Sequence, residues 1–242
     1  MSIKKPKVIV VMPAYNADKT LQKTYFDIPR GVANEVILVD DGSRDNTVKV
    51  AKKLGLRVVT HTQNRGYGGN QKTCYTLALS EGADVVVMLH PDYQYDSTLT
   101  GELIRPILQK RFDIMLGSRI RTRVEVLEGG MPYYKYLGNR FLTLLENFIL
   151  GQNLSEYHTG FRAFSRDILT KVPFHKYSDD FVFDQQILIG AIAQGARVGE
   201  ISVPVRYFPE ASSINFSRST KYGLSIIRDL IFYIILGKKY FS

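Results

Sequence analysis

The sequence contains a single cysteine, Cys74, which excludes an internal disulfide and favours a reducing compartment. No run of residues approaches the roughly 20 apolar positions that a membrane-spanning helix needs. The basic N-terminus, residues 1–7, leads into one short apolar strand and not into a signal-peptide core, so we expect no export. Internal repeats and low-complexity tracts are also missing. What remains is an ordinary globular chain, long enough for one large domain.

Two common phosphate-binding motifs are absent as well. After the apolar run Val8 to Met12 the chain reads Pro-Ala-Tyr-Asn, where a dinucleotide-binding domain has Gly-x-Gly-x-x-Gly. No Gly-Lys-Ser/Thr occurs, which excludes a Walker A loop. A nucleotide would therefore be held by other groups, such as a carboxylate that accepts from a base N–H and a metal ion that neutralises the phosphates.

Charge is the main compositional bias. Lys and Arg number 32 against 23 Asp and Glu, which gives a net charge of +9 and a pI near 9.5. This balance favours anionic partners, namely nucleotide phosphates, a lipid phosphate, an acidic membrane surface or nucleic acid. The basic residues are scattered and no nucleic-acid recognition motif appears, so we predict that nucleic acid is not a partner.

Apolar runs alternate with helical patterns through the first half of the chain. The expected strands are 8–12, 35–39, 57–62, 85–89 and 113–116, and an expected helix follows each of the first four. Strands that alternate with helices at this spacing indicate an α/β fold with a mostly parallel sheet, right-handed crossovers and flanking helices.

The pattern changes after Arg119. Residues 157–164 are expected to return to the core, before a helix at 179–193 and a strand at 197–203. Ahead of them we expect a helix at 134–150, with a row of apolar side chains on one face. That row consists of Leu137, Phe141, Leu144, Leu145 and Phe148.

The loop 90–96 is the first candidate for chemistry, because it follows the fourth expected strand. Ligands of open α/β sheets bind at the carboxyl ends of strands, where His90, Asp92 and Gln94 would lie. Asp92 suits Mg²⁺ that carries phosphates, because Mg²⁺ takes one or two protein carboxylates and completes its shell with water and phosphate. The alternative is a plain helix entry in which Asp96 or its neighbour caps the helix.

Several motifs occur together at the spacing of a known family. They are Pro13-x-Tyr15-Asn16, Val39-Asp40-Asp41-Gly42-Ser43-x-Asp45-x-Thr47, Asn64-x-Gly66-x-Gly68, Asp92-x-Gln94, Gly117-Ser118-Arg119 and Thr159-Gly160-Phe161-Arg162. Over nearly its whole length the chain resembles glycosyltransferase family 2, which has the GT-A fold. The likeness is greatest to the dolichyl- or polyprenyl-phosphate glycosyltransferase branch.

The resemblance implies a nucleotide site at the strand ends. Pro13, Tyr15 and Asp41 would contact the nucleotide, with Asp40 beside them, and Arg119 would meet phosphate. We expect Asp41 and Arg119 to end adjacent strands and to face the same nucleotide.

The resemblance also implies that Asp92 and Gln94 hold Mg²⁺ or Mn²⁺. The family's metal loop normally begins with an acid, and here that position is His90, a neutral ligand that suits Mn²⁺ better than Mg²⁺. The alternative for His90 is a structural hydrogen bond. The usual Glu after Tyr-Asn is Ala17.

The implied reaction is a metal-dependent, inverting displacement at the anomeric carbon of a GDP- or UDP-linked sugar. The metal and Arg119 would stabilise charge on the departing nucleoside diphosphate. A lipid phosphate acceptor needs no general base, whereas a hydroxyl acceptor needs one, for which Asp184 is the candidate. The alternative for Asp184 is a first-turn residue favoured by the helix dipole.

Cations of the second half are expected to meet the phosphate of a polyprenyl phosphate acceptor at the cytoplasmic face of the cell membrane. These are Lys135, Arg140, Arg206, Arg218 and Lys221. One competing hypothesis has the same donor, but the acceptor is a hydroxyl of a glycan or glycolipid. The other is a sugar nucleotidyltransferase, which would need a Gly-rich basic loop after the first strand.

We assign residues 1–220 to one domain, with a nucleotide-sugar half at 1–118 and an acceptor half at 119–220. A C-terminal apolar helix would lie within 221–242, where apolar residues dominate 224–236 and Arg228-Asp229 interrupts them. Such a segment is too short to span a membrane and suits a helix that lies in an anionic interface. The alternative is a terminal helix that closes the core.

Overall fold

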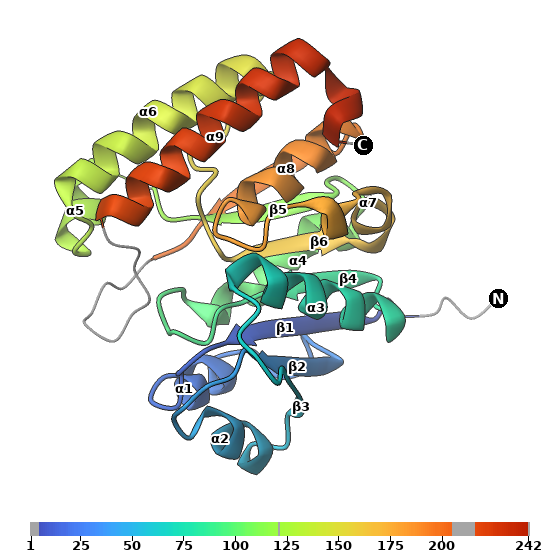
Figure 1. Ribbon diagram of the computed structural model, residues 1–242. Coiled ribbons are helices and arrows are strands. Elements are labelled where there is room, and N and C mark those ends of the chain that lie inside the picture. Colours follow the sequence, from blue (N-terminus) through green and yellow to red (C-terminus); the bar gives the residue numbers. More distant parts are fainter. Residues whose placement is uncertain (1–4, 121, 205–215, 242) are drawn as a thin grey trace.

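In the computed structural model, which describes residues 5–120, 122–204 and 216–241, a seven-stranded sheet runs through the centre of the molecule (Figure 1). The strand order is β3-β2-β1-β4-β6-β5-β7. The strands are β1 (Val8–Ala14), β2 (Glu35–Asp40), β3 (Arg57–Thr60), β4 (Val85–Met88), β5 (Ile114–Ser118), β6 (Arg162–Ser165) and β7 (Val198–Ser202).

Helices cover both faces of this sheet, each over its own apolar cluster. One face carries α1 (Leu21–Phe26), α2 (Thr47–Lys53) and α4 (Thr100–Leu108), which the short 3₁₀ helix η1 (Ser97–Leu99) precedes. The other face carries α3 (Tyr67–Ser80), α7 (Arg166–Lys171), η2 (Phe174–Lys176) and α8 (Phe183–Ala193). The two-sided burial explains why the central strands are continuous apolar runs, as parallel sheets require.

Strand β6 runs antiparallel between β4 and β5, and the other described strands are parallel to one another. The sequence indicated a return to the core at 157–164 without indicating a strand. Because β6 runs in the opposite direction, its first residue, Arg162, pairs with Met88 and Leu116 near the carboxyl ends of its neighbours. Residues 157–161 are thereby placed at the edge of the sheet where ligands bind.

Three further helices form the upper part of the molecule in Figure 1: α5 (Arg123–Glu128), α6 (Tyr133–Leu150) and α9 (Phe216–Leu236), which η3 (Lys238–Phe241) follows. Helices α6 and α9 pack side by side. Helix α9 begins at Phe216, so the domain boundary assigned to residue 221 falls within its first turns. None of the helices in the described part of the chain combines the length and hydrophobicity needed to cross a bilayer.

Helix α6 carries its polar side chains inward. Asn139, Thr143 and Glu146 are buried against the body of the protein. Four members of the apolar row expected from the sequence face outward instead, namely Leu137, Phe141, Leu144 and Phe148, and Phe148 keeps 87% of its surface exposed. The fifth, Leu145, packs against the core. An amphipathic surface helix normally does the reverse. The orientation of α6 is therefore unusual, with polar side chains buried and apolar side chains exposed.

Helix α9 has two apolar faces. Ile226 and Leu230 belong to the buried core, whereas Leu224, Ile234 and Ile235 are exposed. The helix thus closes the core, as one of the two sequence-based alternatives proposed, and it also presents apolar surface next to that of α6.

Candidate active site

Two cavities open at the carboxyl edge of the sheet. The larger, about 860 Å³, is called the strand-end cavity and is lined by Pro13, Tyr15, Asp41, Asn64, Arg218 and Lys221, among others. The smaller, about 480 Å³, is called the α6–α9 cavity and is lined by Gln94, Arg119, Lys135, His158, Ser219 and Leu224, among others.

The two cavities share one wall. Tyr67, His90, Asp92, Phe181 and Tyr222 line both of them. A ligand in one cavity therefore meets a ligand in the other beside the loop 90–96, which the sequence had indicated as the centre of the chemistry.

Asp41 organises the strand-end cavity. Its carboxylate accepts from the backbone N–H groups of Arg65 at 2.8 Å and Gly66 at 3.1 Å, and His61 Nδ1 lies 2.7 Å from its Oδ1. These contacts fix the loop before α3 against the end of β2. Nothing in the sequence patterns had singled out His61, although it follows directly on the end of β3.

Asp40, the other predicted carboxylate at the end of β2, is buried. Its Oδ2 accepts from the backbone N–H of Ser43 at 3.0 Å, and its Oδ1 finds no hydrogen-bond partner among the described residues. Such an orphaned acceptor is uncommon in a protein interior, and it fits a site that a ligand donor or water completes.

His90 and Asp184 are joined through Tyr67. The Tyr67 hydroxyl donates to Asp184 Oδ2 at 2.7 Å and lies 3.0 Å from His90 Nε2, with the two rings stacked. Burial and the neighbouring Asp184 raise the pKa of Tyr67 well above its ordinary value, so the hydroxyl stays a donor. Gln71 donates to the second oxygen of Asp184 at 2.9 Å. Asp184 also lies in the first turn of α8, as the dipole alternative expected.

Asp92 and Gln94 offer a carboxylate and an amide oxygen to the α6–α9 cavity. The described residues include no cluster of three or more His, Cys, Asp or Glu that would enclose a metal by itself. One carboxylate with open positions nonetheless fits Mg²⁺ or Mn²⁺, because phosphates and water normally complete such a shell. Burial raises the pKa of Asp92, and the nearby His90 and Arg119 oppose this effect.

The Thr159–Arg162 motif connects the start of β6 with the loop before it and with the start of α8. Arg162 is fully buried, and its guanidinium donates to the carbonyls of Thr159, Tyr157 and Asp184. A side chain at Gly160 is excluded by close approach, since an added Cβ would lie 2.8 Å from His90 Cδ2. The motif therefore positions His90 and the start of α8 together.

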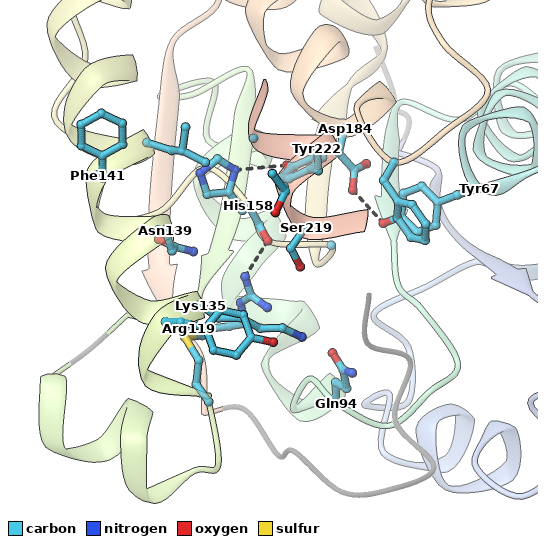
Figure 2. Close-up of a pocket in the computed structure, with 18 of the residues that line it drawn as sticks. Tyr67, Gln94, Arg119, Lys135, Asn139, Phe141, His158, Asp184, Ser219 and Tyr222 are labelled. Carbon is cyan, nitrogen blue, oxygen red and sulfur yellow. Dashed lines mark hydrogen bonds between the residues drawn. The ribbon is translucent and has the colours of Figure 1, made fainter. Parts of the chain in front are cut away.

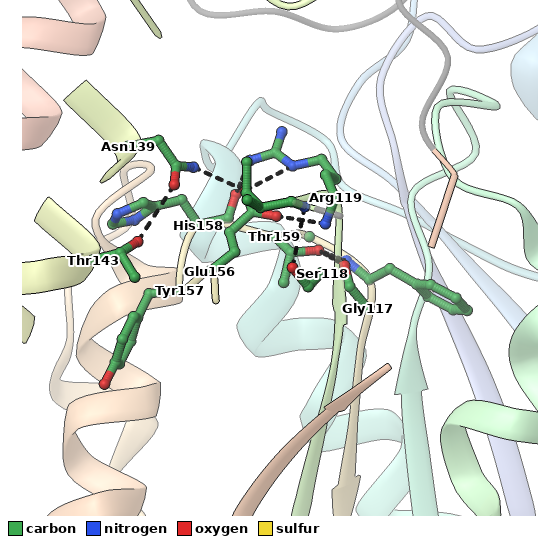
Figure 3. A network of polar contacts seen from close by, with 12 residues as sticks. Gly117, Ser118, Arg119, Asn139, Thr143, Glu156, Tyr157, His158 and Thr159 are labelled. Atoms are coloured by element: carbon green, nitrogen blue, oxygen red, sulfur yellow. Dashed lines mark hydrogen bonds and ion pairs between the residues drawn. The ribbon is translucent and has the colours of Figure 1, made fainter. Parts of the chain in front are cut away.

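Arg119 is held by Glu156, which is fully buried (Figure 3). Arg119 Nε donates to Glu156 Oε1 at 2.8 Å, and the Arg119 backbone N–H donates to Oε2 at 2.7 Å. Asn139 of α6 donates to the same carboxylate at 2.9 Å. Burial alone would raise the pKa of Glu156, but the charge and hydrogen bonds of Arg119 outweigh burial and lower it. Sequence patterns missed Glu156, which lies just upstream of the Thr159–Arg162 motif.

The predicted cations divide between the cavities. Lys135 joins Arg119 in the α6–α9 cavity, and burial with the charge of Arg119 lowers its pKa. Arg218 and Lys221 line the strand-end cavity. Arg140 donates to the Ser155 carbonyl at 2.6 Å and lines neither cavity, and Arg206 lies outside the described residues.

The prediction that Asp41 and Arg119 end adjacent strands is wrong. Asp41 follows β2 and Arg119 follows β5, with β1, β4 and β6 between them. The chain crosses over β1 after β3, and β6 inserts between β4 and β5, so neither β3 and β4 nor β4 and β5 are neighbours in the sheet. Arg119 and Asp41 accordingly line different cavities.

A family model and individual relatives both relate this chain to glycosyltransferases. The sequence model of the family described as Glycosyl transferase family 2 matches residues 9–172. A UDP-N-acetylglucosamine–dolichyl-phosphate N-acetylglucosaminyltransferase of Methanococcus voltae is 27% identical over 83% of this chain and 86% of its own. A dolichyl-phosphate hexose transferase of Haloferax volcanii is 27% identical over 90% of this chain and 92% of its own.

Among solved structures, glucosyl-3-phosphoglycerate synthase from Mycobacterium tuberculosis, in complex with Mn²⁺ and UDP-glucose, superposes with a TM-score of 0.71. The match covers 93% of this chain and 78% of that one, at 20% identity. At this identity the likeness shows a shared fold, and it confirms the fold class expected from the sequence.

Proposed function

The chain belongs to glycosyl transferase family 2, and from that premise we propose that it moves a sugar from a nucleoside-diphosphate sugar to a polyprenyl phosphate. It is a glycosyltransferase with the GT-A fold. The donor and the acceptor are the proposal. One observation carries it: two cavities of different character meet at a shared wall that contains Asp92.

The strand-end cavity is assigned to the donor. Pro13, Tyr15 and Asp41 would contact the nucleoside, with Asp40 beside them, as the family resemblance implies. Arg218 and Lys221 line the same cavity and would neutralise a diphosphate. The relative from Methanococcus voltae is named for a UDP-sugar, and the solved structure holds one, so UDP-sugars are the first donors to test.

The α6–α9 cavity is assigned to the acceptor. Arg119 and Lys135 supply positive charge for a phosphate, and Phe141, Leu142 and Leu224 line the cavity with apolar surface for a hydrocarbon chain. Both curated relatives described above are named for a dolichyl phosphate. Glu156 orients Arg119 before the ligand arrives, which lowers the cost of ordering it on binding.

The transfer needs little proton movement in this arrangement. A phosphate oxygen of the acceptor would bond to the anomeric carbon while the bond to the nucleoside diphosphate breaks, and the acceptor is already an anion. A divalent metal held by Asp92 and Gln94 would neutralise the developing charge on the diphosphate. His90 would keep Tyr67 in place and need not bind the metal, since its Nε2 lies 3.0 Å from the Tyr67 hydroxyl.

Product analysis tests this proposal. The protein is incubated with UDP- or GDP-sugars, Mn²⁺ or Mg²⁺, and either a polyprenyl phosphate or a glycan acceptor. We expect free nucleoside diphosphate only in the presence of the polyprenyl phosphate. Release with the glycan alone would identify a hydroxyl acceptor, and release of pyrophosphate would identify a nucleotidyltransferase.

Asp184→Asn distinguishes the two acceptor classes. With a phosphate acceptor we expect kcat to fall by about tenfold or less, because only hydrogen bonds to Tyr67 and Gln71 are disturbed. If Asp184 removes a proton from a hydroxyl acceptor, kcat should instead fall about 10²- to 10⁴-fold. Steady-state kinetics with saturating donor provides the measurement.

We also propose that the exposed apolar faces of α6 and α9 rest on the membrane that contains the acceptor. Phe141, Leu144 and Phe148 are exposed on α6, and Ile234 and Ile235 are exposed on α9. These two helices pack side by side (Figure 1), and Lys238 and Lys239 follow α9. Apolar side chains flanked by cations are typical of helices that lie in an anionic interface. The mouth of the α6–α9 cavity would then open toward the lipid.

Liposome flotation tests this surface. We expect Phe141→Ser with Phe148→Ser to reduce flotation with anionic liposomes at least about tenfold, because each buried phenylalanine contributes roughly 1.5–3 kcal/mol. Phe26→Ser is the matched control, since Phe26 is 64% exposed, against 62% for Phe141, and lies on α1, far from α6 in Figure 1. Equal flotation of all three proteins would remove the membrane surface from the proposal. Substitutions are preferable to truncation at Gly223, because Ile226 and Leu230 are core residues.

A further inference from the structure

Three polar side chains form a series behind the α6–α9 cavity. Glu146 on α6 is fully buried, and its Oε2 lies 3.2 Å from His158 Nε2. His158 Nδ1 lies 3.1 Å from the hydroxyl of Tyr222 on α9, a contact drawn in Figure 2. A carboxylate, an imidazole and a phenol are thus connected from the interior of the protein to the cavity wall. The function proposed above uses none of the three.

Glu146 has no other partner within the described chain. Neither of its oxygens makes a hydrogen bond of good geometry there, and an isolated buried carboxylate is strongly unfavourable. Burial raises its pKa, and the adjacent His158 ring opposes this effect. In the arrangement that we infer below, His158 Nε2 carries a proton that faces Glu146, because a carboxylate accepts from a donor.

The protonation of the other ring nitrogen, Nδ1, then determines whether the Tyr222 hydroxyl can donate a hydrogen bond into the cavity. In a neutral ring, Nδ1 accepts the Tyr222 hydrogen, and the phenol oxygen presents only lone pairs. In a charged ring, Nδ1–H donates to the phenol oxygen, and the O–H is released toward the cavity. The charged and titratable groups that face His158 are Glu146 from α6, Tyr222 from α9, Glu156 from its own loop, and Arg119, which donates to its carbonyl.

A second hydroxyl lies on the same wall. Ser219 is one turn before Tyr222 on α9, lines the α6–α9 cavity, and has a buried hydroxyl without a hydrogen-bond partner among the described residues. Figure 2 shows Ser219 and Tyr222 across the cavity from Arg119 and Lys135. Two hydroxyls and two cations around one space are suited to the oxygens of a single anion.

We infer that Glu146 and His158 are positioning residues that make the Tyr222 hydroxyl a hydrogen-bond donor to the anionic head group of the acceptor. The inference rests on the proposed function and extends it by naming the residues that recognise the phosphate opposite Arg119. Binding of the anion favours the doubly protonated ring, because the negative charge attracts the imidazolium through the phenol. Anion binding and the proton on His158 are therefore linked.

Calorimetry with farnesyl phosphate, in the presence of UDP and Mn²⁺, tests the role of Tyr222. We expect Tyr222→Phe to raise the Kd for farnesyl phosphate about tenfold, because a hydrogen bond to a charged group is lost. Tyr157→Phe is the matched control, since its hydroxyl bonds to Asn147 and it lines neither cavity. An unchanged Kd for farnesyl phosphate in Tyr222→Phe would overturn the inference.

The pH dependence separates positioning from a merely structural role. The quantity to compare is the Kd of His158→Gln for farnesyl phosphate divided by that of the wild type. Protonation of farnesyl phosphate itself affects both Kd values equally and therefore does not change this ratio. We expect this ratio to be larger in mild acid than in mild alkali, because only a charged ring donates to the Tyr222 oxygen. A ratio that stays constant with pH would show that His158 only supports the fold. Glu146→Gln should weaken binding most near neutral pH and regain wild-type binding in mild acid.

The binding and transfer measurements distinguish a failure of this inference from a failure of the proposed function. If the wild type binds farnesyl phosphate but transfers no sugar to it, the proposed reaction is wrong, whereas the proposed phosphate-binding role of Tyr222 is retained. If the wild type binds but Tyr222→Phe binds equally well, only the role of Tyr222 is wrong. If the wild type does not bind farnesyl phosphate, both are wrong.

Discussion

Replacing Asp92 by asparagine is expected to lower kcat/KM for sugar transfer by about a thousandfold, which is the scale for loss of an electrostatic group at a developing charge. Asp92 is the acidic side chain on the wall shared by both cavities. Its partner Gln94 is neutral, so asparagine would leave no anionic ligand from this loop. The Kd for Mn²⁺ in the presence of UDP, measured by calorimetry, should rise along with the loss of rate.

Asp96→Asn is the matched control for this experiment. Asp96 lies in the same loop, where its Oδ1 accepts from the backbone N–H of Thr98 at 3.1 Å and caps η1. Because asparagine is also a good capping residue, we expect stability and turnover close to those of the wild type. An Asp92→Asn variant that binds Mn²⁺ and UDP as tightly as the wild type would refute the metal assignment.

Replacing Glu156 by glutamine is expected to lower the free energy of unfolding by about 3–5 kcal/mol at neutral pH, because removing one partner of a buried ion pair leaves the other without compensation. Glu156 is fully buried, and the Arg119 side chain is 14% exposed where it lines the α6–α9 cavity. The loss should also raise the KM for the acceptor, since Arg119 is no longer held against the cavity wall. Urea unfolding and steady-state kinetics measure the two effects.

The pH dependence of this effect has a defined sign. The pKa of Glu156 is lower in the folded protein than its ordinary value of roughly 4.3. Its stabilisation is therefore complete above that ordinary value and is lost as the pH falls through the folded pKa. We expect the stability difference between wild type and Glu156→Gln to narrow in acid.

Asp113→Asn controls for ion pairs in general. Asp113 pairs with Arg197 at 3.0 Å, but the Arg197 side chain is half exposed. Such a surface pair contributes about 1 kcal/mol or less, so its loss should be small. A stability loss in Glu156→Gln no larger than that in Asp113→Asn would contradict the role given to the buried pair.

Sequence patterns predicted much of the fold because the signals were local. Pro13 and the loop at Asp92 follow apolar runs of strand length, and a parallel arrangement brings such ends to one edge of the sheet. Parts of the candidate site were predictable for the same reason: Asp41 and Arg119 directly follow strand ends, and Asp92 lies in the loop after β4. His90 was predicted as a site residue, but its contact with Tyr67 was not.

The partners of these residues were not predictable from local patterns. Glu156, His158 and Tyr222 carry no periodic signal, and each contacts a residue on another element. The order of the strands was also hidden, because β6 inserts between β4 and β5 through pairings with residues that are distant in the sequence. This insertion separated Arg119 from Asp41 and produced two cavities where one nucleotide site was expected.

The sequence by itself determined the α/β class, the family resemblance and the loop that carries Asp92. The tertiary structure decided which way α6 faces. The spacing of Leu137, Phe141 and Phe148 defines an apolar stripe, but a helical period does not say whether that stripe meets the core or the surroundings. Glu146 lies inward beside His158, and the apolar stripe is left outside. That orientation is a property of long-range packing, which no local pattern encodes.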